Sequence, residues 1–314
     1  MSDDHPADDV IARVAALPPL RDVIGRQRLS ARRSLGQHFL LDLNLARRIA
    51  RAAGPLGTGT TIEIGPGPGG LTRALLIEGA GHVIAVERDP RAIASLCDLK
   101  QAAQDRLDVI EGDARRLAFD TLGTAPRRVV ANLPYNIATM LIVQWLTAPR
   151  ALESITVMVQ KEVAMRLCAV AGSPDHGRLG ILVRWLTEPT LLFEVPARAF
   201  TPPPRVTSAV VRLVPRPQPL YPARGATLQR LTAAAFGQRR KMLRASLRPL
   251  GGITLLEEAG IDPQARPETL DVADFCRLAR TYDRTAPSEA AAKPVDEVVE
   301  PGQPAPAAPF SDQD

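Results

Sequence analysis

Residues 61–72, Thr-Ile-Glu-Ile-Gly-Pro-Gly-Pro-Gly-Gly-Leu-Thr, join a short apolar strand pattern to a glycine-rich turn and the start of a helix. Glycines let the backbone turn sharply and let a ligand come close to it. The spacing here is G-x-G-x-G, which differs from the G-x-G-x-x-G spacing of dinucleotide-binding turns. The stretch therefore predicts a strand-to-helix turn that either cradles a ligand or only reverses the chain.

The region around this turn alternates short runs rich in valine and isoleucine with helical patterns. Such alternation predicts an α/β fold, with a parallel sheet covered by helices on both faces. Two later runs are expected to form an antiparallel strand pair at one edge of the sheet. The strands are expected at 61–64, 82–87, 107–112, 128–132, 155–160, 190–195 and 206–215, and the intervening helices near 70–79, 90–103 and 137–147.

Composition divides the chain into segments. Residues 1–30 form an N-terminal arm, and residues 31–215 carry the α/β pattern. A proline-rich linker, 215–225, leads to residues 226–283, whose purely helical patterns predict a small all-α domain. Residues 285–314 are rich in proline, alanine and acidic groups, with little to bury, so we expect disorder there.

Polar side chains close the strands that follow the glycine turn. In open α/β sheets, ligands bind at the carboxyl ends of the strands. Glu87 ends the second strand, where an acid can accept hydrogen bonds from both ribose hydroxyls or simply face solvent. Asp113 follows the third strand and can accept from an adenine amino group or cap a helix. Gly65 closes the first strand and Asn132 the fourth. A glycine, two acids and an amide thus stand at four strand ends, which together indicate one ligand site.

Asn132-Leu133-Pro134-Tyr135 suits the binding of a planar amine. The Asn132 side-chain oxygen and the carbonyl of Leu133 or Pro134 can each accept a hydrogen bond from an exocyclic NH2 group. The Tyr135 ring can stack on the base that carries this group. The alternative is a proline turn with a packed tyrosine, because four-residue matches are common.

Four features, taken in chain order, resemble those of an S-adenosylmethionine-dependent adenine N6-methyltransferase. They are EIGPGPGGLT (63–72), Glu87, GDA (112–114) and NLPY (132–135). Three further stretches make the chain similar to the ribosomal RNA adenine dimethyltransferase family, in its bacterial small-subunit type. They are SLGQHFL (34–40), QKEVAMRL (160–167) and FTPPPRVTSAVV (200–211). The resemblance runs from about residue 30 to residue 283. It implies a Rossmann-like methyltransferase sheet followed by an all-α C-terminal domain.

The resemblance also implies a cofactor site for S-adenosyl-L-methionine. In it, Glu87 binds the ribose and Asp113 the adenine ring, while Asn132 lies where cofactor meets substrate. His38 stands where many relatives have asparagine, and its alternative role is packing at the sheet rim. The full implied set of cofactor-binding residues is His38, Leu40, Gly65, Gly67, Glu87, Asp113 and Asn132.

Methyl transfer from a sulfonium needs an in-line approach of the nitrogen more than acid–base help, so positioning dominates. The resemblance implies that Asn132, Pro134, Tyr135 and Phe200 form the catalytic set. Tyr135 and Phe200 would hold the two faces of an adenine that has left its stack. Phe200 can alternatively serve only to anchor the Thr-Pro-Pro-Pro loop that follows it.

The net charge of +5 and the pI of about 9.5 are mild signs of a polyanionic partner. Lysine occurs only four times, so the positive charge is nearly all arginine, which binds phosphate through its two-pronged guanidinium. For any one of these residues the alternative is a solvated surface. The expected RNA-binding residues are Arg32, Arg33, Arg205, Arg239, Arg240, Lys241, Arg244 and Arg248. The last three arginines are spaced to share one helix face if this stretch forms a single helix.

The resemblance implies N6,N6-dimethylation of two adjacent adenosines in a hairpin loop near the 3′ end of 16S rRNA in the small subunit. Four cofactor molecules would be used, with a role in ribosome biogenesis. Alternatives are a 23S rRNA methylase, a mainly non-catalytic assembly factor and, less well matched, a DNA adenine methylase.

Neither a secretory signal nor an apolar run of membrane-spanning length is evident. The three cysteines, Cys97, Cys168 and Cys276, are too scattered to predict a disulfide framework or a zinc site. We therefore expect a metal-free, monomeric, cytoplasmic protein.

Overall fold

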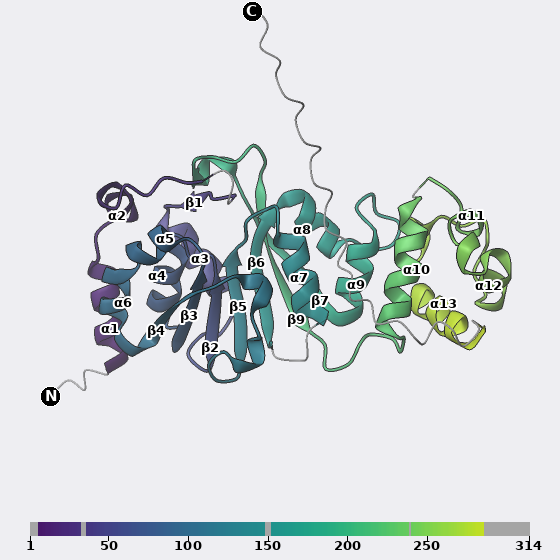
Figure 1. Cartoon of the computed structure of the whole chain (residues 1–314), viewed down its shortest axis with the longest axis horizontal. Coiled ribbons are helices and arrows are strands. Elements are labelled where there is room, and N and C mark those ends of the chain that lie inside the picture. Colours follow the sequence, from purple (N-terminus) through teal and green to yellow (C-terminus); the bar gives the residue numbers. More distant parts are fainter. Residues whose placement is uncertain (1–5, 33–35, 148–151, 239, 286–314) are drawn as a thin grey trace, which may run out of the picture.

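The computed structural model describes residues 6–32, 36–147, 152–238 and 240–285. Figure 1 shows a sheet with flanking helices at the left and a helical part at the right, along the longest axis of the molecule. The expected disorder of the C-terminal tail concerns residues that lie outside the described part, apart from Thr285.

The central sheet has seven strands in the order β4-β3-β2-β5-β6-β9-β7. The five strands from β4 to β6 are parallel, and β9 runs antiparallel to both β6 and β7. The expected antiparallel pair at one edge is therefore confirmed, with β9 pairing inward as well. The strands are β2 (Thr60–Ile64), β3 (His82–Glu87), β4 (Leu107–Glu111), β5 (Arg127–Asn132), β6 (Ser154–Gln160), β7 (Thr187–Val195) and β9 (Ser208–Pro215).

Helices cover both faces of this sheet, as the alternating pattern predicts. One core packs α1, α3, α4 and α6 against one face, and a second core packs α7 and α8 against the other. The helix expected over 90–103 is divided near Leu96. These helices are α1 (Pro6–Ala16), α3 (Leu43–Ala52), α4 (Gly70–Ile77), α5 (Pro90–Ser95), α6 (Cys97–Ala103), α7 (Ala138–Thr147) and α8 (Lys161–Cys168).

A separate two-stranded ribbon lies beside the sheet. It pairs β1 (Phe39–Leu40) with β8 (Phe200–Thr201), in the register Phe39 with Thr201 and Leu40 with Phe200. The ribbon joins two stretches that are 160 residues apart in the chain, GQHFL and FTPPPR, and the short helix α2 (Leu20–Arg26) precedes it. Both stretches are thereby held near the carboxyl ends of the parallel strands.

A third core belongs to the C-terminal helices. Helix α9 (Arg178–Leu186) contributes Ile181, Leu182 and Trp185 to it, although α9 lies before the proline-rich linker. The helical part is thus packed onto the sheet-bearing part through α9. The other helices are α10 (Gly225–Gly237), α11 (Leu243–Ser246), α12 (Gly252–Glu258) and α13 (Val272–Thr285).

The prediction that Arg240, Arg244 and Arg248 lie on one continuous helix is wrong. Met242 is extended, with φ −65° and ψ 153°, so α11 begins only at Leu243. The backbone amides of Leu243 and Arg244 donate to the carbonyls of Ala265 and Pro263, which fixes this break. A 3-10 turn follows from Arg248 to Leu250. Arg240, Arg244 and Arg248 therefore do not lie on one face of a continuous helix.

Candidate active site

A cavity of about 270 Å³ lies at the carboxyl ends of β2, β3, β4 and β5. These strands are parallel neighbours, so their last residues meet at one edge of the sheet. The structure brings most of the expected site residues to this cavity. The expected residues that line it are His38, Leu40, Gly65, Gly67, Glu87, Asp113, Asn132, Pro134 and Tyr135.

The glycine turn after β2 needs its glycines. Gly65, Gly67 and Gly69 have φ values of +67°, +54° and +92°, a region that favours glycine. A β-carbon on Gly69 would lie 2.6 Å from Leu96 Cδ2, so the end of that leucine side chain would have to shift. A β-carbon on Gly65 would meet no atom within 4 Å. The turn is therefore tightly packed at Gly69 and open at Gly65, which lines the cavity.

Glu87 is fixed by the backbone around it. Its Oε2 accepts from the Gly67 amide at 3.1 Å, and its Oε1 accepts from the amides of Arg88 and Asp89 at 2.8 and 2.9 Å. The residue is 7 % exposed. Each oxygen of a carboxylate can accept more than one hydrogen bond, so the group can still receive ribose hydroxyls. The glycine turn and the acid of the neighbouring strand form one rigid unit.

Asp113 both caps a short helix and forms an ion pair. Its Oδ1 accepts from the Arg115 amide at 3.0 Å, as a helix cap does. The Arg115 guanidinium bonds the same carboxylate, with Nη2 2.5 Å from Oδ2. This hydrogen bond holds the pKa of Asp113 at about 2. Asp113 therefore stays ionised, and Arg115, which the sequence did not single out, shares the cavity wall.

The amide of Asn132 has a defined orientation. Its Nδ2 donates to the backbone carbonyl of His38 at 3.2 Å. Because a carbonyl only accepts, this bond turns Oδ1 away as the free acceptor of the side chain. Asn132 thus has an oxygen available to an amine at the cavity, as its residue type suggests.

Tyr135 is held at its hydroxyl and on one ring face. Its Oη lies 2.6 Å from Ser208 Oγ, and its ring stacks on His38 with centroids 5.7 Å apart and 26° between planes. Nδ1 of His38 donates to the Pro202 carbonyl at 2.8 Å, which fixes the imidazole in turn. Burial raises the pKa of Tyr135, so the phenol stays neutral. His38 therefore positions Tyr135 as well as lining the cavity.

Phe200 does not line the cavity. Its side chain packs in the core of the α1, α3, α4 and α6 face and is 3 % exposed. In this arrangement the ring anchors β8 beside β1. Base stacking by Phe200 stays a prediction and requires the ring to turn out of the core.

Glu63 is a cavity residue that the sequence reasoning quoted but did not assign. It is 1 % exposed, lines the cavity, and no described residue donates to its Oε2. Burial, with the Glu87 carboxylate as a lesser cause, raises the pKa of Glu63 to about 8. The available signal was an acid in the first strand, two residues before Gly65. Such a carboxyl suits a cationic ligand, which would favour its charged form.

The raised pKa of Glu63 predicts a pH-dependent stability. The folded protein holds the proton more tightly than the unfolded chain, so this stabilisation is full below about pH 4.5 and is lost as the pH rises towards 8. Glu63→Gln should therefore flatten the fall in melting temperature between pH 5 and 8, measured without cofactor. Glu258→Gln, at an exposed position on α12, is the matched control and should keep the wild-type profile. An unchanged profile in Glu63→Gln would contradict the assignment.

The expected RNA-binding residues within the described part of the chain are exposed and widely separated in sequence. Arg32 lies beside the cavity wall, since its amide donates to Oε1 of Gln37. Arg205 follows the Thr-Pro-Pro-Pro loop, while Arg240, Lys241, Arg244 and Arg248 lie on the helical part. Arg33 and Arg239 lie outside the described residues.

The sequence profile of the family described as ribosomal RNA adenine dimethylase matches residues 28–284. The chain belongs to this family. It is 59 % identical over 268 residues to the ribosomal RNA small subunit methyltransferase A of Rhodospirillum rubrum, covering 85 % of this chain and 93 % of the relative. The protein of the same description from Paramagnetospirillum magneticum is 58 % identical over 271 residues, covering 86 % and 96 %.

Two solved structures resemble this adenine dimethylase. A dimethyladenosine transferase from Plasmodium falciparum has a TM-score of 0.69 at 26 % identity, covering 79 % of this chain and 98 % of its own. The 23S rRNA methyltransferase ErmE has a TM-score of 0.57 at 30 % identity, covering 78 % and 99 %. The chain is thus a Rossmann-like methyltransferase that transfers methyl groups from S-adenosylmethionine to adenine in ribosomal RNA. The Oε2 atom of Glu63, which has no hydrogen-bond donor among the described residues, and the open side of Gly65 fit this cationic cofactor.

Proposed function

We propose that this enzyme dimethylates N6 of two adjacent adenosines in a hairpin loop near the 3′ end of 16S rRNA, within the small ribosomal subunit, and so serves its biogenesis. The relatives of 59 % and 58 % identity, both described as small-subunit methyltransferases, support this substrate over large-subunit RNA. The single structural observation that carries the chemistry is the oriented amide of Asn132 at the cavity.

S-adenosylmethionine, when bound, supplies a methyl group that its sulfonium already activates. We assign its ribose to Glu87 and its adenine to the neighbourhood of Asp113, with the glycine turn and Leu40 enclosing it. The carboxyl of Glu63 would face the cationic portion. Asn132, on the neighbouring strand β5, separates this pocket from the place where the target base enters.

The amine of the target adenine would donate to Asn132 Oδ1 and to one backbone carbonyl. The Pro134 carbonyl already accepts from the amides of Ile137 and Ala138, at 3.2 and 3.1 Å, where the chain enters α7. We therefore assign the second acceptor to Leu133. Two acceptors favour a more pyramidal nitrogen, whose lone pair is less conjugated with the ring and better aimed at the methyl group.

Tyr135 would stack on the extruded adenine. Its hydroxyl bond to Ser208 and its contact with His38 fix the ring before the base arrives, which limits the entropy lost on binding. Extrusion costs least for a base in a hairpin loop, because fewer stacking contacts are broken there. This favours the proposed hairpin-loop substrate.

The working form is proposed to be a cytoplasmic, metal-independent monomer. Among the described residues, no helix has the length and apolar character needed to cross a bilayer. Within the same residues, no cluster of three His, Cys, Asp or Glu side chains could hold a metal ion.

The test compares the methylation of small and large ribosomal subunits by this enzyme. Small and large ribosomal subunits from cells lacking N6-dimethyladenosine are incubated separately with the purified enzyme and labelled cofactor. We expect close to four methyl groups per small subunit, because two adenosines each take two. Large subunits should take up essentially none. Preferential labelling of the large subunit would overturn the proposed substrate in favour of a 23S rRNA methylase.

A further inference from the structure

Residues 6–30 of the N-terminal arm are docked on the sheet-bearing part, although most of them precede the family match that begins at residue 28. Helix α1 buries Val10 and Val14 against the core that includes α4 and α6. Arg73 of α4, itself 8 % exposed, donates to the carbonyls of Ala15, Leu17 and Pro18 at 2.6 to 2.8 Å. The chain entering α2 is therefore tied to the helix that follows the glycine turn.

Helix α2 contacts the wall of the cofactor cavity at its first residue. At its start, Leu20 packs over Gly70, since a β-carbon on that glycine would lie 3.0 Å from Leu20 Cδ2. Gly70 lines the cavity. Past its end, Leu29 is 4 % exposed, and the Ser30 carbonyl accepts from Arg91 at 3.4 Å. The arm is thus anchored on both sides of α2.

Arg91 links this anchored segment, through Asp89, to Glu87, the carboxylate assigned to the cofactor ribose. Its guanidinium bonds the buried carboxylate of Asp89 through Nε at 3.0 Å and Nη2 at 2.6 Å. The Asp89 carboxylate also accepts from Nε2 of Gln37, and the Asp89 amide donates to Glu87. The position of the arm is therefore fixed relative to the carboxylate assigned to the ribose.

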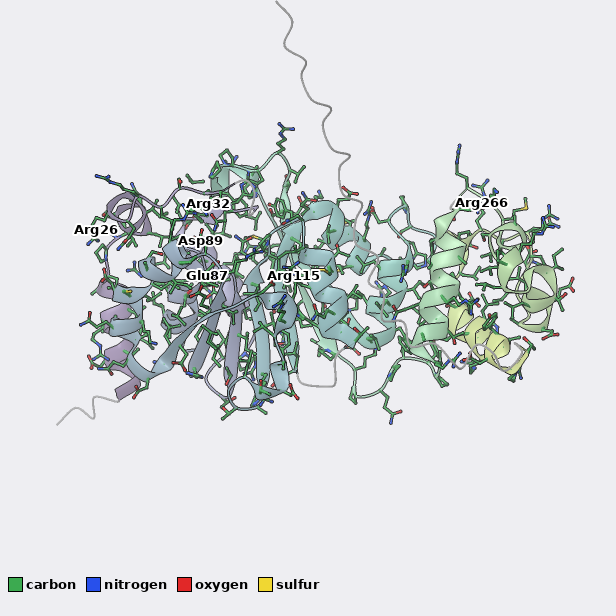
Figure 2. All side chains as sticks on the ribbon, viewed as in Figure 1. Arg26, Arg32, Glu87, Asp89, Arg115 and Arg266 are labelled. Atoms are coloured by element: carbon green, nitrogen blue, oxygen red, sulfur yellow. The ribbon has the colours of Figure 1, made fainter. Side chains whose placement is uncertain are left out.

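The exposed surface of this docked segment is basic. Residues 21–32 hold four arginines, Arg21, Arg26, Arg28 and Arg32, against the single acid Asp22. All four are exposed, and no described residue forms an ion pair with any of their guanidinium groups. Figure 2 shows Arg26 and Arg32 on the same part of the molecule as Glu87, Asp89 and Arg115, with Arg32 drawn just above Asp89. Exposed arginines without a carboxylate partner suit phosphate, because the planar guanidinium group binds its oxygens through two parallel hydrogen bonds.

We propose that α2 and the residues after it, 20–32, form a cationic ledge that binds the phosphate backbone of the RNA beside the target adenosine. The ledge rests on the proposed function, since it presupposes an RNA substrate at the adjoining cavity. It extends the RNA surface beyond the arginines expected from the sequence, to Arg21, Arg26 and Arg28. The contacts on both sides of α2 set the distance between the bound backbone and the cofactor site.

The test compares two double variants with the wild type. Arg21→Glu with Arg26→Glu reverses two ledge charges. Arg51→Glu with Lys100→Glu makes the same charge change on α3 and α6, where Arg47 remains to pair with Glu78. We measure affinity for deproteinised small-subunit RNA over a range of salt concentrations, cofactor affinity and methylation rate.

The ledge variant should bind RNA at least about tenfold more weakly than the control at low salt. The slope of log affinity against log salt should become shallower by about 1.4 to 1.8, the value for two lost phosphate contacts. Cofactor affinity should equal that of the wild type, which also shows that the variant is folded.

Equal RNA affinity in the two variants would overturn the ledge. Weaker binding only to the assembled particle would also overturn it, because the partner would then be a ribosomal protein. A wild-type enzyme that leaves the RNA of assembled small subunits unmethylated would instead contradict the proposed function, so the two failures are distinguishable.

Discussion

Replacing Asn132 by alanine should lower the rate of methyl transfer by at least about 100-fold, with cofactor binding partly kept. The side chain supplies one of the two proposed acceptors for the amine, and removing one preorganised polar group from an active site costs about 100- to 1,000-fold in rate. Its loss also frees the His38 carbonyl. Single-turnover methylation with saturating cofactor, together with calorimetric cofactor binding, separates the two effects.

Asn132→Asp is the informative second variant. Aspartate keeps an oxygen for the amine, but as a carboxylate it cannot donate to the His38 carbonyl. We expect a rate between those of alanine and asparagine. Asn44→Ala, at an exposed position at the start of α3, should methylate as the wild type does. Near-normal turnover in Asn132→Ala would remove this residue from the reaction.

Replacing Glu87 by glutamine should weaken cofactor binding by about 10- to 100-fold. Three backbone amides and the proposed ribose hydroxyls share this carboxylate, and hydrogen bonds to a charged group contribute about 1.5–3 kcal/mol. Glutamine offers one acceptor oxygen and turns a donor towards the amides. The effect is expected on the dissociation constant of the cofactor and on its KM, with kcat at saturation largely kept.

Glu111 provides a matched control for this change. It pairs directly with Glu87 across the parallel strands β3 and β4, yet it does not line the cavity. Glu111→Gln should therefore bind cofactor like the wild type. Equal weakening in both variants would mean that Glu87 acts through the general charge of the sheet edge and does not contact the ribose.

The parts of the molecule that follow from local pattern could be predicted from the sequence. Strand runs such as 82–87 are bounded by turns, and the parallel arrangement then places Gly65, Glu87 and Asn132 at one edge. The break in the helix near Arg244 could not be predicted from the sequence. The backbone amides at the break donate to the carbonyls of Pro263 and Ala265, which are distant in sequence.

Site features that depend on tertiary contacts likewise could not be predicted from the sequence. Nothing local indicates that His38 would stack on Tyr135, and nothing local decides between base stacking and packing in the core for Phe200. The docking of the arm is of the same kind, since Arg73 reaches carbonyls more than 50 residues away. The type of each of these residues suggested which interactions it could make, whereas the fold determined which residue it contacts.

The central claim is that this chain places two methyl groups on N6 of each of two adjacent adenosines in small-subunit RNA. The direct measurement is mass mapping of nuclease fragments of 16S rRNA after incubation of unmethylated small subunits with the wild-type enzyme or with Asn132→Ala. The account predicts one loop fragment near the 3′ end, heavier by four methyl groups with the wild type and unshifted with the variant. Methylation confined to another fragment, or an equal mass shift with Asn132→Ala, would contradict it.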